Sequence, residues 1–222
     1  MNPLMRTFAG ATLAVAALQA HAGITAVSGP TNLIAAPASM RYTANAYNDS
    51  NVQYWVEREN HVLANDLVIS MLPPGSFPTN VTSHFNNNDN KILAGTAIDS
   101  YHLYFDPQSG SAVARFQTDR PILGLITNER SSAANDHFML SDFLINPLVP
   151  SGNIPGSHFD ARGLEIGANE FVRWIGPNDI EVNLSATNPG DQIRVITAAV
   201  PEPATVAALG LGALALLRRK RV

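Results

Sequence analysis

Hydrophobic and polar residues alternate along the middle of the chain with the two-residue period of β-strands. Residues 179–185 (Asp-Ile-Glu-Val-Asn-Leu-Ser) alternate without a break, which predicts a strand with one buried face. Further apolar or alternating runs predict strands at Val52–Glu57, Ala97–Phe105, Ser111–Gln117, Pro121–Ile126, Glu170–Ile175 and Gln192–Thr197. This pattern indicates a domain built from strands.

Turn-forming residues separate these runs. Clusters of Pro, Gly, Asn and Asp lie at 73–75, 107–110, 176–179 and 188–191. No long amphipathic helix pattern interrupts the strands, and Ser141–Asn146 is the one place where we expect a helical turn. Many short strands joined by such turns favour an all-β fold, a single antiparallel β-sandwich of jelly-roll-like topology that spans residues 23–199.

The first 22 residues have a different pattern. A single cation, Arg6, precedes a mostly apolar run from Phe8 to Leu18. Ala20 and Ala22 then place small residues at the −3 and −1 positions of a signal-peptidase site, with cleavage expected before Gly23. This order predicts a secretory signal peptide, so we expect signal peptidase to remove it and the remaining chain to be exported.

The C-terminal segment 200–222 combines three features. In order, they are the tripeptide Pro201, Glu202, Pro203, the apolar run Ala204–Leu217, and the basic cluster Arg218, Arg219, Lys220, Arg221. As a helix, the 14 residues of this run would reach about 21 Å, short of a hydrocarbon core of about 30 Å. Because clustered cations beside a hydrophobic run stay in the cytoplasm, we expect the domain outside and a membrane-inserted helix, as a permanent or a temporary anchor.

This order of tripeptide, apolar run and basic cluster resembles the PEP-CTERM sorting signal. The resemblance implies that exosortase, a membrane-embedded cysteine transpeptidase, recognises Pro201, Glu202 and Pro203, and that the basic cluster stops transfer. It also implies delivery to the cell surface or extracellular matrix, in association with exopolysaccharide and biofilm. Whether the tail is removed or kept, and which bond near Glu202 is cut, stays open on the sequence.

Composition narrows the classes of function. Residues 23–200 contain nine basic and 17 acidic residues, a net charge of about −8 with neutral histidine. Such a domain repels phosphate backbones, which argues against nucleic acid as a partner. The chain has no cysteine, which excludes a disulfide framework, a zinc–thiolate site and a thiol nucleophile. We expect no cofactor.

Two stretches carry the most candidate chemistry. The segment His84–Lys91 is rich in asparagine and offers oxygen ligands for calcium, but it has one carboxylate and ends on an opposing cation, so we interpret it as a flexible hairpin loop. Glu57 and Glu59 would lie about 7 Å apart on one face of a strand. That spacing is compatible with glycoside hydrolysis, although solvent-exposed glutamates are the simpler interpretation.

The histidines of the central region are scattered, without an H-x-H or HExxH pair: His61, His84, His102, His137 and His158. We therefore expect no metal site, and we interpret most of them as surface or loop residues. Trp174 lies in an apolar run and is expected in the core.

The sequence and the resemblance together predict an exported protein with a structural or adhesive role and no enzymatic activity. Exopolysaccharide as the partner follows from the resemblance. Two alternatives stay open. One is a glycan hydrolase or lyase that uses Glu57, Glu59 or carboxylates of later loops, and the other is a lectin stabilised by calcium at Asn86–Asn90.

Overall fold

Strands make up most of the described part of the fold. The computed structural model describes residues 23–36, 49–81, 89–127, 137–144, 163–164, 170–186 and 190–199, which lie within one compact unit, Ala22–Val200. The strands are β1 (Ile24–Ser28), β2 (Thr31–Leu33), β3 (Asp49–Val62), β4 (Leu67–Val68), β5 (Thr79–Val81), β6 (Lys91–Ile92), β7 (Ala97–Asp106), β8 (Gly110–Thr118), β9 (Ile122–Ile126), β10 (Phe171–Gly176), β11 (Asp179–Ala186) and β12 (Asp191–Ala198). A short helix, α1 (His137–Ser141), continues into a 3-10 helix, η1 (Asp142–Leu144).

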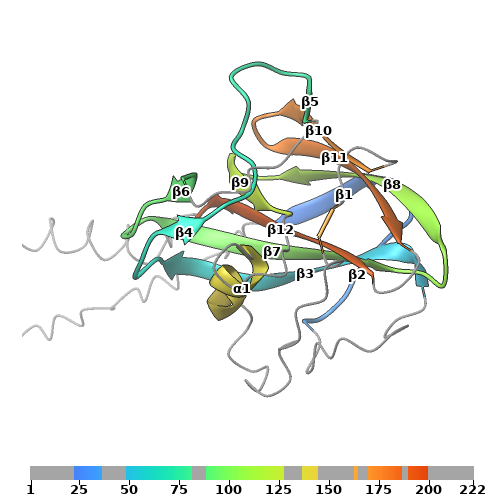
Figure 1. Cartoon of the computed structure of the whole chain (residues 1–222), viewed down its shortest axis with the longest axis horizontal. Helices are drawn as coiled ribbons and strands as arrows, with labels where there is room; N and C mark the ends of the chain where they lie inside the picture. Colours follow the sequence, from blue (N-terminus) through green and yellow to red (C-terminus); the bar gives the residue numbers. More distant parts are fainter. Residues whose placement is uncertain are drawn as a thin grey trace, which may run out of the picture. The chain divides into compact units, whose positions relative to one another are not determined.

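Two five-stranded sheets form the two layers of the domain (Figure 1). Sheet A has the strand order β1-β8-β11-β10-β5, and sheet B has the order β2-β3-β7-β12-β9. Neighbouring strands are antiparallel, except that β2 pairs in parallel with β3. β4 and β6 form a separate two-stranded sheet. The chain crosses between the layers, because β7 and β9 belong to sheet B whereas β8 belongs to sheet A.

The seven strands expected from the sequence pattern are present as β3 and β7–β12. The pattern did not predict β1, β2, β4, β5 and β6, and the last four have only two or three residues, too few to show an alternation. The helical turn expected at Ser141–Asn146 begins earlier, at His137. Short edge and connecting strands are thus the part of the fold that local periodicity misses.

These elements confirm an all-β fold. The jelly-roll-like connection of the strands stays a prediction. The expected signal peptide at 1–22 and the apolar helix at 204–217 lie outside the described residues. Within the ranges that the structure describes, no helix has the length and hydrophobicity to cross a membrane.

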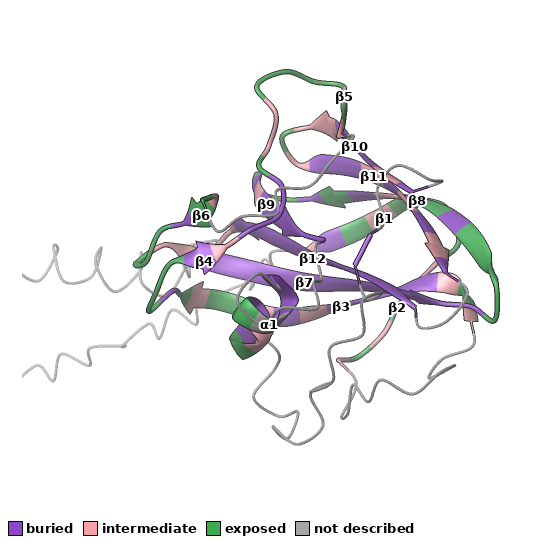
Figure 2. Ribbon diagram, viewed as in Figure 1, coloured by how far each residue is buried: buried purple, intermediate pink, exposed green. Residues whose placement is uncertain are grey.

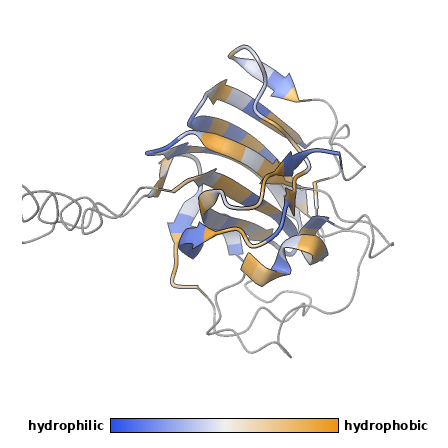
Figure 3. Cartoon of the chain, turned by 90° about the vertical axis from the view of Figure 1, so that its left-hand side faces the viewer, coloured by the Kyte–Doolittle hydropathy of each residue, from blue (hydrophilic) through white to orange (hydrophobic). Residues whose placement is uncertain are grey.

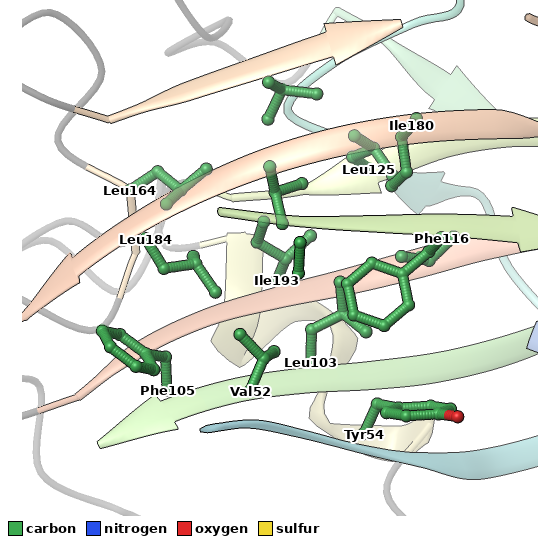
Figure 4. Packing of buried hydrophobic residues seen from close by; sticks show 14 of the residues in the cluster. Val52, Tyr54, Leu103, Phe105, Phe116, Leu125, Leu164, Ile180, Leu184 and Ile193 are labelled. Carbon is green, nitrogen blue, oxygen red and sulfur yellow. The ribbon is translucent and has the colours of Figure 1, made fainter. Parts of the chain in front are cut away.

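The main hydrophobic core lies between the two sheets (Figure 4). In β11, Ile180, Val182 and Leu184 are fully buried while the residues between them are half-buried, which confirms the single buried face predicted from the alternation. Leu103 of sheet B packs in the same cluster. Trp174 is also fully buried there, as expected. Because burying one such side chain contributes roughly 1.5–3 kcal/mol, this face holds the layers together.

The outer face of sheet A is mostly polar and open to solvent, with Val113 as an exposed aliphatic residue among the polar ones. Side chains alternate along a strand, so the residues between the core positions point outward, and Figure 3 shows polar and apolar residues alternating along the strands. The strand register aligns one outward row across β8, β11, β10 and β5, consisting of Arg115, Glu181, Arg173 and Asn80. Each of these residues is exposed or half-buried.

The outer face of sheet B is buried as well. β7 shows this clearly, because every residue from Ile98 to Asp106 is buried (Figure 2). A second hydrophobic cluster joins Ile98 and Ile196 of sheet B to Phe138 of α1 and Leu144 of η1. The helical segment therefore covers this face, and polar groups beneath it are removed from water.

Gly29, in the connection between β1 and β2, has a φ of +97°, which favours glycine. A Cβ there would lie 2.2 Å from the carbonyl oxygen of Val113. We expect Gly29→Ala to lower the free energy of unfolding by roughly 1–3 kcal/mol in urea denaturation. Gly75→Ala is the matched control, because a Cβ at Gly75 meets nothing within 4 Å. Equal effects of the two substitutions would contradict this prediction.

Candidate functional site

A cluster of polar side chains lies on the covered outer face of sheet B. We call it the Glu57 cluster, and its members are Glu57 of β3, Ser100 and His102 of β7, Gln192 and Arg194 of β12, and Ser141 of α1. The register brings them together, because His102 pairs with Arg194 on one side and with β3 on the other. All members are buried. Charges at such depth are costly unless they are paired and hydrogen-bonded.

Arg194 and Glu57 form a bidentate ion pair at the centre of this cluster. Nε of Arg194 donates to Oε2 of Glu57 at 2.6 Å, and Nη2 donates to Oε1 at 2.9 Å. This fork geometry is the strongest arrangement of an arginine–carboxylate pair. Nη1 donates to Oγ of Ser141, and Nη2 lies 3.8 Å from Oδ1 of Asp142. The ring of Phe138, with its centroid 5.8 Å from Cζ of Arg194, covers the pair.

His102 connects the ion pair to β12. Its Nδ1 lies 3.0 Å from Oε1 of Glu57, and its Nε2 lies 3.0 Å from Oε1 of Gln192. The ring donates from Nδ1 to the Glu57 carboxylate, and its Nε2 lies against the side-chain amide of Gln192. Trp55 stacks on the ring, with centroids 4.5 Å apart and planes inclined by 13°. The imidazole is therefore held at both edges and on one face.

Hydrogen bonds hold α1 over the cluster at both ends. At its first residue, His137, Nδ1 lies 2.8 Å from Oγ of Ser70, and the backbone N–H of Thr127 donates to the same oxygen at 3.0 Å. At its last residue, the hydroxyl of Ser141 accepts from Arg194 and donates to the carbonyl oxygen of His137 at 2.7 Å. The Glu57 cluster thus ties the helix to β3, β7 and β12.

The Glu57 carboxylate is poorly suited to act as a base. Burial by itself raises the pKa of Glu57, but the charges and hydrogen bonds of Arg194 and His102 lower that pKa well below its ordinary value of 4.5. Ser100 also donates to Oε2 at 2.6 Å, so the two oxygens together accept four hydrogen bonds. A saturated carboxylate with a lowered pKa holds strands together and does not readily take a proton from a substrate.

A groove of about 350 Å³ lies beside β3, between Val56–Glu59 and the segment Leu33–Ala36. It includes Glu57 and Glu59, the two carboxylates whose spacing suggested glycoside hydrolysis. The side chain of Glu57 is 1% exposed, whereas Glu59 is exposed. Because hydrolysis needs two carboxylates that both reach the sugar, this placement argues against a catalytic pair.

A known family accounts for the C-terminal segment. Residues 199–221 match the PEP-CTERM protein-sorting motif. The chain carries a PEP-CTERM motif. This match confirms the resemblance inferred from the tripeptide, the apolar run and the basic cluster. The PEP-CTERM motif implies export, processing by exosortase and a surface or extracellular location after processing. Searches among curated proteins and solved structures gave no match to this chain.

The residues assigned to the PEP-CTERM motif from the sequence lie outside the described residues: Pro201, Glu202, Pro203, Arg218, Arg219, Lys220 and Arg221. Ala20 and Ala22 of the expected signal-peptidase site lie outside them as well. Gly23 is described, and its carbonyl oxygen accepts from the backbone N–H of Asp119 at 3.3 Å. The individual roles of these residues stay predictions.

One expectation about the polar residues of the domain is wrong. The sequence places Glu57 on a solvated face, but it is 4% exposed, because α1 covers the outer face of sheet B on which Glu57 lies. Of the five histidines, most of which were expected at the surface or in loops, His102 and His137 are fully buried, whereas His84 and His158 lie outside the described residues. Alternation within one strand does not reveal that a distant helix covers the second face of its sheet. Arg194, a lone cation in the apolar run of β12, is the signal that could have pointed to the cluster.

Part of the asparagine-rich loop falls within the described residues. Asp89 is exposed, and the carbonyl oxygen of Asn90 accepts from the backbone N–H of Ile69 at 3.0 Å. The preceding residues, 82–88, lie outside the description. Within the described ranges, no group of three or more histidines and carboxylates could hold a metal ion.

Proposed function

We propose that the protein is an exosortase substrate whose β-sandwich domain has a structural or adhesive role in exopolysaccharide, at the cell surface or in the extracellular matrix. The PEP-CTERM motif at 199–221 supports the export and the sorting. The observation that carries the polysaccharide role is the open polar face of sheet A.

The outer face of sheet A supports contact with a glycan. Its outward positions carry hydroxyl, amide and charged groups, which can donate to and accept from sugar hydroxyls. They are Thr25, Asn80, Ser111, Arg115, Gln117, Arg173, Glu181, Asn183 and Ser185. The sheet arranges these groups in rows across five strands, a spacing that suits a long, repetitive polymer.

The buried, hydrogen-bonded position of Glu57 fits a binding role of the domain better than a catalytic role. The Glu57 carboxylate is committed to Arg194, His102 and Ser100, so it serves the packing of α1 on sheet B. Glu59 is exposed, but Glu57, the partner that the strand spacing suggested for glycoside hydrolysis, is not accessible to a sugar. We therefore propose a domain that binds a glycan without cleaving it.

The test of this function is co-sedimentation of the processed protein with exopolysaccharide purified from the host. We expect Arg173→Ala/Glu181→Ala to lose most of the binding, because this ion pair, 3.8 Å apart, lies in the central rows of sheet A. Asp66→Ala/Lys91→Ala is the matched control, because it removes another exposed pair, 3.9 Å apart, beside β4 and β6. Unchanged sedimentation of both variants would contradict the proposed face.

The release of reducing ends from the same polysaccharide separates binding from cleavage. We expect none from the parent protein. Release that Glu59→Gln abolishes would establish a glycan hydrolase instead. A melting temperature that rises with calcium, falls with chelator and loses both responses on deletion of Asn86–Asn90 would establish the calcium-stabilised lectin.

A further inference from the structure

The chain enters and leaves the described domain at the same end. The carbonyl oxygen of Gly23 accepts from Asp119, and the carbonyl oxygen of Pro121, two residues further on, accepts from the backbone N–H of Ala198 at 3.1 Å. We call this the terminal end of the domain. Figure 1 shows it at the left, where β3 and β12 end and β7 begins.

Two exposed aliphatic side chains flank the point where the chain leaves. Val62, the last residue of β3, pairs with Ala97 of β7, whose carbonyl oxygen accepts from the backbone N–H of Ala199 at 3.1 Å. Leu93 lies in the turn between β6 and β7, where its carbonyl oxygen accepts from Thr96 at 3.2 Å. Val62 is 59% exposed and Leu93 is 67% exposed. Both side chains are therefore accessible to a partner at this end of the domain.

Charges of both signs occur near these side chains. Lys91, two residues before Leu93, has its Nζ 3.9 Å from Oδ2 of Asp66. Asp119, beside Gly23, is followed by Arg120. The domain as a whole is acidic, so a surface where opposite charges offset each other is the one that approaches lipid headgroups with least repulsion.

The sequence limits how far this end can lie from the apolar run of the PEP-CTERM motif. Four residues, Val200–Pro203, separate Ala199 from Ala204. A fully extended chain over these steps spans at most about 18 Å. When the apolar run is inserted in a bilayer, the terminal end therefore lies within that distance of the lipid surface.

We propose that Val62 and Leu93 form a lipid-contacting surface that holds the domain on the bilayer while the apolar run is inserted. The inference rests on the sorting part of the proposed function and adds a binding surface and its partner. Aliphatic side chains are stabilised at the boundary between headgroups and acyl chains. Contact at this end keeps Pro201–Pro203 at the membrane surface, where a membrane-embedded peptidase works.

The lack of cysteine allows one fluorescent label to be placed at a time. The chain is isolated from membranes of a host without exosortase, labelled with bimane, and reconstituted into phosphatidylcholine vesicles with a nitroxide quencher on the headgroup. We expect the label on Leu93→Cys or Val62→Cys to lose most of its fluorescence. Leu33→Cys is the matched control, because Leu33 is 66% exposed but pairs with Tyr54, roughly 26 Å along β3 from Val62.

Flotation of the vesicles separates the two ways in which the inference can fail. If the chain co-floats and the labels at Leu93 and Leu33 are quenched equally, or neither is quenched, the lipid contact is wrong while the anchoring stands. If the chain does not co-float, the apolar run is not inserted and both ideas fail. Quenching at Leu93 that requires added exosortase would assign the surface to the enzyme and overturn the lipid contact.

Discussion

Replacing Arg194 by methionine is expected to lower the free energy of unfolding by roughly 3–5 kcal/mol at neutral pH. The guanidinium makes two hydrogen bonds to Glu57 and one to Ser141 beneath α1, and both partners are buried. Without it, the Glu57 carboxylate remains charged in a site from which water is excluded. Urea denaturation measures this loss, and release of α1 should accompany it, because Ser141 then loses its contact with β12.

The direction in which that loss changes with pH distinguishes a charge effect from a packing effect. In the parent chain the pKa of Glu57 is lowered, so its stabilising contribution is present above the ordinary value of 4.5 and is lost as pH falls. In Arg194→Met, the charge of Arg194 no longer opposes the effect of burial, so the pKa of Glu57 is higher than in the parent. The deficit of the variant should therefore be largest at neutral pH and shrink as pH falls below the ordinary pKa.

Two comparisons test this explanation. Arg173→Met removes an exposed arginine that lies 3.8 Å from Glu181, and we expect a loss of about 0–1 kcal/mol. Glu57→Gln/Arg194→Met removes both charges and should recover part of the stability that Arg194→Met loses. A loss in Arg194→Met as small as that in Arg173→Met, or one that does not change with pH, would show that the ion pair does not hold α1 in place.

Seven strands of this fold could be predicted because the residues of each one reflect its environment. β11 reads as a strand from its own residues, since its buried side chains recur at every second position. In β7 both faces are buried, so polar residues such as Ser100 and His102 lie on a covered face and the pattern does not show which face meets solvent. β2 and β5 form because they pair with β3 and β10. Their own residues therefore do not predict them.

The Glu57 cluster could not be predicted in the same way. Its hydrogen bonds join residues up to 137 positions apart. The spacing of Glu57 and Glu59 suggested a shared face, but the register shift between Val56 and Arg58 and the cover by α1 give them different environments. Which side chain a buried arginine meets depends on sheet order, and sheet order is a property of the whole chain.

The substitution with the largest expected effect on the processing and location of the protein is Pro201→Ala/Glu202→Ala, within the PEP-CTERM motif. Two prolines favour an extended, accessible backbone, which presents Glu202 to a peptidase at the membrane. In the host, we expect the parent protein to lack both the signal peptide and the basic cluster Arg218–Arg221. The variant should keep that cluster and stay in the membrane fraction. Intact mass and cell fractionation measure both properties.

Glu59→Ala is the control for this experiment, because it removes an exposed glutamate from the domain and leaves the motif intact. It should be processed and released like the parent. If parent and variant both keep the basic cluster and both stay in the membrane, the tripeptide does not direct processing in this protein. The apolar run would then be a permanent anchor, the lipid contact of Val62 and Leu93 would persist throughout the life of the protein, and the matrix role would lose the release step on which it depends.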